Sequence, residues 1–123
     1  MSTREHREPG PAHPITVTPT EGEVVVRVAG TVVARTTSAL TLAEAGHPAV
    51  QYVPLDDVDP DVLRPSDTRT WCPYKGEASY WSVSAGGTDL PDGVWGYPDA
   101  SPAVARIAGH VAFSPDRVSV TVG

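Results

Sequence analysis

Residues 23–36 read Glu-Val-Val-Val-Arg-Val-Ala-Gly-Thr-Val-Val-Ala-Arg-Thr, and this stretch decides the fold class. Val24, Val26 and Val28 occupy every second position, which places their side chains on one face of an extended strand. The glycine that follows interrupts the pattern, and the β-branched run after it favours a second strand joined to the first by a tight turn. The stretch therefore predicts a β-hairpin.

The same kind of pattern recurs along the rest of the chain. Further strands are expected at residues 15–18, 50–54, 77–83, 94–97, 110–113 and 118–122. Residues 40–45 fit either a short strand or one helical turn, while 64–69 and 84–93 are expected to be loops. The sequence thus predicts a mainly β protein with about eight strands.

One or two short helices are expected beside these strands. Ser101 and Pro102 form a helix start signal, which predicts a helix over 103–108 that stops at the glycine after it. Asp59 precedes a proline and is expected to cap a single turn that begins there.

The length of 123 residues fits one domain with a single hydrophobic core. Residues 1–14 contain three prolines, two histidines and almost no apolar side chain, so nothing offsets the entropy of ordering them. We expect a flexible N-terminal tail over 1–14 and a single β-rich domain over 15–123.

Charge and composition exclude several functions. Fifteen acidic against nine basic residues give a formal net charge of −6, which argues against nucleic-acid binding. The single cysteine excludes an intrachain disulfide and is typical of a reducing compartment, so a cytoplasmic location is expected. No apolar run has the length of a signal peptide or of a membrane helix, so we expect neither export nor membrane insertion.

Residues 70–83 hold the only cysteine, two of the three tryptophans, two of the four tyrosines and a lysine. Within them, Lys75 precedes Gly76, and a glycine lets the backbone and the ammonium approach a ligand together. The alternative is a turn lysine in solvent. Tyr74 is a further acid–base candidate, and Trp71 a ligand-binding one.

Three motifs resemble a known family. They are residues 70–83 (Thr-Trp-Cys-Pro-Tyr-Lys-Gly-Glu-Ala-Ser-Tyr-Trp-Ser-Val), 94–98 (Val-Trp-Gly-Tyr-Pro) and 107–113 (Ile-Ala-Gly-His-Val-Ala-Phe). The resemblance is to domain-of-unknown-function family 427, which also carries a nucleotidyltransferase-like label, and it spans roughly 15–122. It implies a small open-barrel or tent-like (Mss4-like) β architecture. Some proteins of that architecture hold a structural zinc between paired Cys-x-x-Cys motifs, which a chain with one cysteine cannot build.

Cys72 and His110 are candidates with open alternatives. The ammonium of Lys75, three residues on, favours Cys72 as a nucleophile, although a lone cysteine is also often a small buried hydrophobe. His110 suits acid–base chemistry near neutral pH, although a histidine at a strand end is also often structural.

The aromatic residues divide by strand parity. Tyr80 and Trp81 are neighbours on one strand and therefore point to opposite faces, so one of them belongs to the core. Trp95 and Tyr97 share a face, which suits a pocket for a small, flat ligand. The alternative is that all these rings stabilise the core.

The leading hypothesis is a small-molecule-binding β domain whose Trp-, Tyr- and Lys-lined pocket is centred on residues 71–80, with acid–base or lysine-assisted chemistry. The first alternative is a non-catalytic protein-interaction module. The second is a metal-dependent nucleotidyl or phosphoryl transferase, which requires the carboxylates of 56–61 to converge near the pocket. No cofactor or metal is expected, and a homodimer is a possibility because small β domains often pair their sheet edges.

Overall fold

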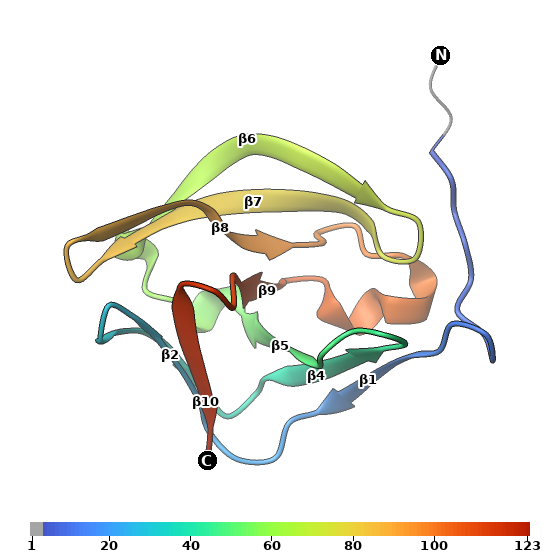
Figure 1. Cartoon of the computed structure of the whole chain (residues 1–123), viewed down its shortest axis with the longest axis horizontal. Helices are drawn as coiled ribbons and strands as arrows, with labels where there is room; N and C mark the ends of the chain where they lie inside the picture. The colour runs from blue at the N-terminus through green and yellow to red at the C-terminus, as the bar shows by residue number, and fades with distance from the viewer. Residues whose placement is uncertain (1–3) are drawn as a thin grey trace.

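Strands dominate residues 4–123, the part of the chain that the computed structural model describes (Figure 1). The strands are β1 (Ile15–Pro19), β2 (Val24–Val28), β3 (Thr31–Thr36), β4 (Leu40–Glu44), β5 (Val50–Pro54), β6 (Leu63–Cys72), β7 (Gly76–Ala85), β8 (Thr88–Gly96), β9 (His110–Phe113) and β10 (Val118–Val122). The helices are short 3-10 turns: η1 (Leu55–Asp57), η2 (Pro60–Val62) and η3 (Pro102–Ile107). The predicted mainly β class with few short helices is confirmed.

The strands form two antiparallel sheets. The larger has seven strands in the order β1-β4-β5-β9-β8-β7-β6, and the smaller has three in the order β10-β2-β3. Figure 1 shows the larger sheet curving, so that β6 lies above and β1 lies below the interior. Its end strands do not pair with each other, so within 4–123 the sheet does not close into a barrel. The Mss4-like relationship stays a prediction.

The hairpin predicted from residues 23–36 is confirmed as β2 and β3. Ala29 and Gly30 form its two-residue turn with φ values of 48° and 80°, as the right-handed twist of a tight hairpin requires. The alternate valines of β2 are fully buried against the larger sheet.

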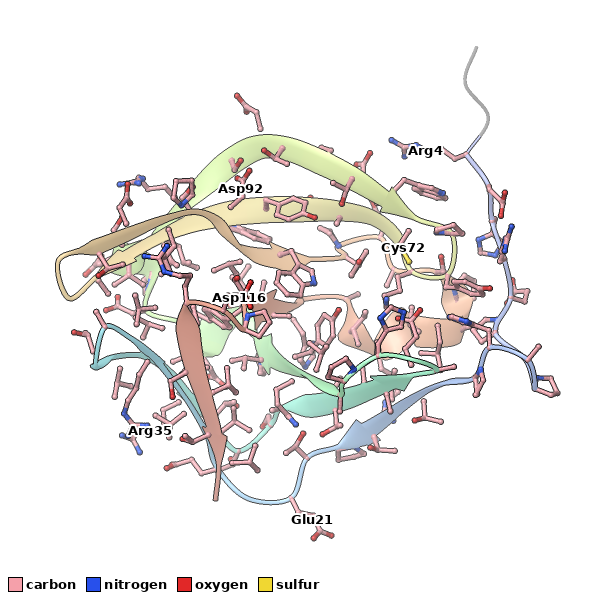
Figure 2. The ribbon with its side chains drawn as sticks, viewed as in Figure 1. Arg4, Glu21, Arg35, Cys72, Asp92 and Asp116 are labelled. Atoms are coloured by element: carbon pink, nitrogen blue, oxygen red, sulfur yellow. The ribbon has the colours of Figure 1, made fainter. Side chains whose placement is uncertain are left out.

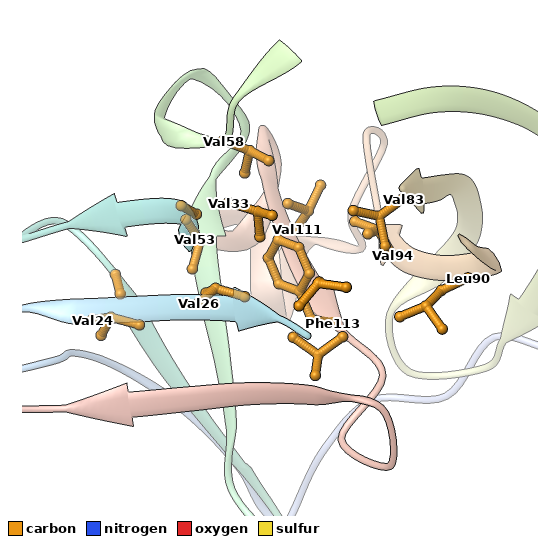
Figure 3. Packing of buried hydrophobic residues seen from close by; sticks show 14 residues of the cluster. Val24, Val26, Val33, Val53, Val58, Val83, Leu90, Val94, Val111 and Phe113 are labelled. Carbon is orange, nitrogen blue, oxygen red and sulfur yellow. The ribbon is translucent and has the colours of Figure 1, made fainter. Parts of the chain in front are cut away.

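Two clusters of buried side chains fill the interior. The first lies between the sheets, where Val26 and Val33 of the smaller sheet face Val94, Val111 and Phe113 of the larger one (Figure 3). The second cluster lies at the other end of the larger sheet and supports the candidate site described below. Its buried members are Leu40, Leu42, Tyr52, Ala78, Tyr97, Val104, Ile107 and Ala112.

Two expected loops are strands, so these predictions were wrong. Residues 64–69 belong to β6, and of 84–93 only Gly86 and Gly87 form the expected turn, while the residues before and after them end β7 and begin β8. As the end strand of its sheet, β6 pairs on one side only, and most of its side chains are exposed. Its sequence therefore shows no apolar alternation. The ambiguous segment 40–45 contains a strand, β4.

The two predicted helical turns differ in outcome. Asp59 caps η2, because its side chain accepts a hydrogen bond from the backbone N–H of Asp61, and this prediction is confirmed. The segment after Ser101 is not a regular α-helix: η3 is a 3-10 helix interrupted at Val104, whose φ is −127°. The side chain of Ser101 makes no cap hydrogen bond.

The N-terminal segment lies against the hairpin of β6 and β7. The N–H of Arg7 donates to the carbonyl of Pro73 at 2.9 Å, and the indole N–H of Trp71 donates to the carbonyl of Glu5 at 2.7 Å. Met1, Ser2 and Thr3 of the expected tail lie outside the described residues. The flexibility of 1–14 stays a prediction. No helix within 4–123 has the length and apolar character to cross a membrane.

Candidate functional site

An open cleft of about 710 Å³ lies beside the turn that joins β6 to β7. We call it the aromatic cleft, because four of its lining residues are tyrosines and one is a tryptophan. It is lined by His13, Leu42, Glu44, His47, Pro48, Val50, Tyr52, Cys72, Pro73, Tyr74, Lys75, Tyr80, Asp92, Trp95, Tyr97 and Ser114. In Figure 2, Cys72 marks the end of β6 at this place. The N-terminal segment, β4, β5 and the hairpin of β6 and β7 all contribute to it.

The backbone around Lys75 is held from two sides. Its N–H donates to the carbonyl of Cys72 at 3.3 Å, and its carbonyl accepts from the N–H of Ser101 at 2.9 Å. The next residue, Gly76, has a φ of 109°, and a Cβ there would lie 3.2 Å from the carbonyl oxygen of Asp99. Glycine is therefore needed at this position for the turn to carry the lysine to the cleft.

The ammonium of Lys75 points inward and meets Glu44, at the end of β4. The distance from Nζ to Oε1 is 2.7 Å, and the two side chains are only 12% and 11% exposed. A pair that is so little solvated is screened far less than a surface ion pair. The lysine is thus a fixed charge at the wall of the cleft.

Glu44 also contacts His13, whose Nε2 lies 2.8 Å from Oε2. Burial alone would raise the pKa of the Glu44 carboxyl, but hydrogen bonds from Lys75 and His13 outweigh it and hold this pKa below its usual range. The ring of His13 in turn stacks on Tyr74 at a centroid distance of 4.2 Å and an interplanar angle of 13°. One ionised carboxylate therefore joins the N-terminal segment to the β6–β7 turn.

Cys72 and Tyr97 complete the surroundings of the ammonium. Sγ of Cys72 lies 3.9 Å from Nζ of Lys75, and the centroid of the Tyr97 ring lies 5.9 Å from it. The thiol and the ring face thus share one cation.

Tyrosines form the deep wall of the cleft. Burial raises the pKa of Tyr52 to about 12, and burial likewise raises the pKa of Tyr97. Both phenols therefore stay protonated at neutral pH, as hydrogen-bond donors rather than bases.

The structure brings most of the predicted site residues together. Those that line the aromatic cleft are Cys72, Tyr74, Lys75, Tyr80, Trp95 and Tyr97. The expected parity is confirmed, since Tyr80 packs on the second core cluster and Trp81 on the first. The roles assigned to these residues stay predictions.

Three predicted residues do not line the cleft. Trp71 lies on the outside of the hairpin, where the guanidinium carbon of Arg4 sits 4.8 Å from its ring centroid. Gly76 supports the turn through its backbone, as described above. His110 lies at the start of β9, opposite Pro54, with its Nδ1 3.1 Å from the carbonyl of Ala108.

Sequence reasoning missed Glu44 and His13. Leu40, Leu42 and Glu44 share one face of β4, so the glutamate follows two buried leucines into the interior. A strand assignment for 40–45 would have revealed this, because an acidic residue on an apolar face needs a partner. The sequence around His13 gives no comparable indication of a buried partner, because its neighbours are prolines, glycine and alanine and form no apolar face.

Two of the aspartates of 56–61 have structural contacts within the fold. Asp57 accepts a hydrogen bond from the hydroxyl of Thr36 at 2.7 Å, and Asp59 caps η2. None of these aspartates lines the aromatic cleft. Among the described residues, no three histidine, cysteine, aspartate or glutamate side chains are grouped so that they could hold a metal ion.

Fold and site together define a class: a mainly β domain of two antiparallel sheets, with an aromatic cleft built around a lysine–glutamate pair. The chain belongs to the family described as a domain of unknown function, DUF427, whose sequence model matches residues 16–123. The expected family is thereby confirmed. No curated protein matches the sequence.

Proposed function

We propose that this protein binds a small, flat organic molecule in the aromatic cleft and assists acid–base chemistry on it through Lys75. The observation that carries the proposal is the Lys75–Glu44–His13 cluster, which sits in the wall of a cleft that is otherwise largely aromatic and aliphatic. Small-molecule sites are typically apolar pockets into which a small number of polar groups point.

The size and lining of the cleft favour a small ring compound. A volume of about 710 Å³ falls within the range of roughly 300–1,000 Å³ of small-ligand pockets. Tyrosine and tryptophan rings offer flat contacts at little cost in side-chain entropy, and their polar atoms set orientation. A planar ligand with one anionic or carbonyl oxygen suits this lining.

Lys75 supplies the polar anchor. An ammonium has three N–H donors, of which one is directed at Glu44 and a weak one at the sulfur of Cys72. Within residues 4–123 no other side chain or carbonyl accepts a hydrogen bond from this ammonium, so the remaining donor can bind a carbonyl or carboxylate oxygen of a ligand. Such a contact polarises a carbonyl and stabilises negative charge that develops on its oxygen.

Glu44 and Tyr74 support the acid–base part of the proposal. The lowered pKa of Glu44 keeps it a carboxylate at neutral pH, so it holds the lysine in place as its charged partner. The phenol of Tyr74, stacked on His13, lines the same cleft. Cys72, next to the ammonium, is the candidate nucleophile.

The position of Lys75 weighs against the interaction-module alternative. That alternative expects a lysine in solvent above a filled core, whereas this side chain is 12% exposed and borders the cleft. The transferase alternative receives no support, because none of the aspartates of 56–61 lines the cleft, and Asp57 and Asp59 accept hydrogen bonds within the fold.

Thermal unfolding of the wild type and of Lys75→Met tests the proposal. The panel comprises aromatic carboxylates, aromatic carbonyl compounds, nucleotides and divalent metals. A ligand at 100 times its dissociation constant stabilises the native state by about 2.7 kcal/mol, which shifts Tm by several degrees. We expect at least one aromatic acid or carbonyl compound to stabilise the wild type and to lose this effect in Lys75→Met.

Arg64→Met is the matched control, because Arg64 pairs with Asp89 on the surface, away from the cleft. This variant should respond to the ligand as the wild type does. A compound that stabilises Lys75→Met as strongly as the wild type contradicts the role of the lysine, and a panel with no effect on a folded wild type contradicts the binding function. A stabilising compound is then incubated with the protein to measure its conversion.

A further inference from the structure

We propose that β10 pairs with β10 of a second copy of this chain, antiparallel and about a two-fold axis at Val120. The small sheets of the two copies then form one continuous sheet. The inference is independent of the proposed ligand. It starts from a comparison of the four edge strands and of the contacts that keep each from pairing with another chain.

Three of the four edges are blocked. On β3, Val58 forms a β-bridge with Ala34, and the N–H of Asp59 donates to the carbonyl of Val33 at 2.8 Å. On β1, the guanidinium of Arg106 donates to the carbonyl of Val17 at 2.9 Å.

The edge formed by β6 is blocked by other means. It contains Pro65, which has no N–H to donate, and the exposed charges of Arg64 and Arg69. Its pairing with β7 is also irregular between Pro65 and Arg69. Proline, charge and irregular pairing are the features by which proteins keep edge strands from pairing with other chains.

β10 has none of these features. Its sequence, Val-Ser-Val-Thr-Val, contains no proline, no glycine and no charge, and it pairs only with β2 among the described residues. A regular, uncharged, β-branched edge strand is a template for strand addition.

The backbone groups on the open side belong to the valines. Glu23 and Gly123 exchange both of their hydrogen bonds, at 2.8 and 2.9 Å, so they form a hydrogen-bonded pair. Because such pairs alternate along an antiparallel ladder, Ser119 and Thr121 direct their backbone groups toward β2. Val120 and Val122 therefore direct theirs away from it.

The open side is complementary to itself. With Val120 on the two-fold axis, Val118 lies opposite the partner's Val122, and Ser119 lies opposite the partner's Thr121. The two Val120 residues would exchange two hydrogen bonds, and the N–H of Val122 would donate to the carbonyl of the partner's Val118. Apolar side chains then face apolar ones and hydroxyls face hydroxyls, as an interface between identical surfaces requires.

A groove of about 470 Å³ lies along the same strand. Its lining includes Val50, Trp95, Phe113 and the three valines of β10, together with the polar side chains of His47 and Gln51. Val120 and Val122 are 37% and 49% exposed there. The valines of a second β10 would face this groove and shield it from water, which adds an apolar contribution to the backbone hydrogen bonds.

Charge limits where a second copy can bind. The chain carries a formal net charge of −6, so two copies repel each other, and the repulsion is smallest where the contact surface itself is uncharged. Residues 118–122 provide such a surface. Because Trp95 lines both this groove and the aromatic cleft, the partner strand would lie close to the wall of the proposed ligand site.

Sedimentation equilibrium of the full chain tests the proposal. We expect the wild type to sediment at twice the monomer mass of 12.9 kDa at high concentration. Val120→Lys should sediment as a monomer, because it places two ammonium groups opposite each other on the axis. Val32→Lys is the matched control: Val32 is 40% exposed on β3 of the same sheet, and this variant should stay dimeric.

A monomeric wild type at every concentration overturns the proposal, as does a dimer that Val120→Lys leaves intact. Cross-linking provides a second measurement that does not require a charge in the strand. In a Cys72→Ser background with oxidised glutathione as the oxidant, Val120→Cys should give a disulfide-linked dimer and Val32→Cys should not. Equal cross-linking of the two variants places the contact elsewhere and also overturns the proposal.

Discussion

Lys75 and Glu44, 31 positions apart in the sequence, form an ion pair of 2.7 Å that is almost nine-tenths buried. The pair connects the β6–β7 turn to the end of β4, two places that no backbone hydrogen bond joins directly within the described residues. A buried pair costs desolvation when it forms, and removal of one partner leaves the other charge uncompensated. The pair therefore makes the geometry of the cleft dependent on both side chains.

Lys75→Ala should lower the free energy of unfolding. Breaking a fully buried pair costs about 3–5 kcal/mol, and we expect about 1–3 kcal/mol here because His13 still contacts the carboxylate. Urea unfolding followed by tryptophan fluorescence measures the difference.

Arg35→Ala is the control for this prediction, because Arg35 pairs with Glu23 at 2.8 Å on the surface, with both side chains about half exposed. Its effect should stay within about 0.5 kcal/mol. The double variant Lys75→Met with Glu44→Leu should recover most of the lost stability, since an apolar pair leaves no unpaired charge. Equal losses in Lys75→Ala and Arg35→Ala contradict the buried pair.

Glu44 should make stability depend on acid pH. Burial raises its pKa, but the hydrogen bonds from Lys75 and His13 outweigh burial, so its pKa in the folded state lies below the unfolded value of about 4.5. As pH falls, the unfolded chain binds the proton first, so the contribution of Glu44 is present above about pH 4.5 and is lost as pH falls through the folded pKa. The pKa values of Asp89 and Asp92 are lowered too, so the measurement is the difference between the wild type and Glu44→Gln.

Wild-type urea midpoints should therefore fall more steeply below pH 4.5 than those of Glu44→Gln. Parallel pH profiles of the two proteins are the outcome that contradicts this assignment.

Much of the fold follows from local sequence. The β2–β3 hairpin is predictable because alternate valines and the Ala29–Gly30 turn agree with each other. The opposite orientations of Tyr80 and Trp81 follow from strand parity alone. The capped turn at Asp59 depends on neighbouring residues only. In each case the information lies within a few positions.

The rest depends on contacts between distant segments. β6 is a strand because β7 pairs with it, and its exposed side chains leave no alternation in the sequence to report this. Glu44 and His13 meet Lys75 only after the larger sheet has formed and residues 4–14 lie along it. Residues 70–83 indicated one wall of the site, but no local pattern points to the partners that hold its lysine.

Two tyrosines should ionise late in an alkaline titration. Burial raises the pKa of Tyr52 to about 12 and raises that of Tyr97 as well. Because the unfolded chain loses these protons first, at about pH 10, the contribution of the two phenols to stability is full below pH 10 and is lost as pH rises above it.

Phenolate absorbance should show a late ionisation step that belongs to Tyr52 and Tyr97. In Tyr52→Phe and Tyr97→Phe the late step should shrink by one tyrosine each. The absence of any late ionisation step above pH 10, in protein that stays folded, contradicts the burial of Tyr52 and Tyr97.

Gly96→Ala should destabilise the sheet beneath the cleft. A Cβ at this position would lie 2.7 Å from the carbonyl oxygen of His110, on the paired strand β9. The strands must separate to admit it, at a cost of about 1–3 kcal/mol. Gly10→Ala makes the same change where a Cβ meets nothing within 4 Å, and its effect should stay within about 0.5 kcal/mol. Urea midpoints compare the variants, and equal midpoints show that β8 and β9 do not approach so closely.

Limited proteolysis measures how readily the N-terminal segment detaches from the cleft. His13 stacks on Tyr74 and contacts Glu44, and the N–H of Arg7 donates to Pro73, so cleavage by trypsin after Arg7 requires this segment to open. Tyr74→Leu removes the stacked ring, and we expect cleavage at this site to accelerate by at least several fold. Tyr80→Leu serves as the control, since the Tyr80 hydroxyl pairs with Thr70 of β6 and has no such contact with His13. If the wild type is already cleaved as fast as Tyr74→Leu, these contacts do not hold the segment and residues 1–14 behave as the flexible tail that their composition predicts.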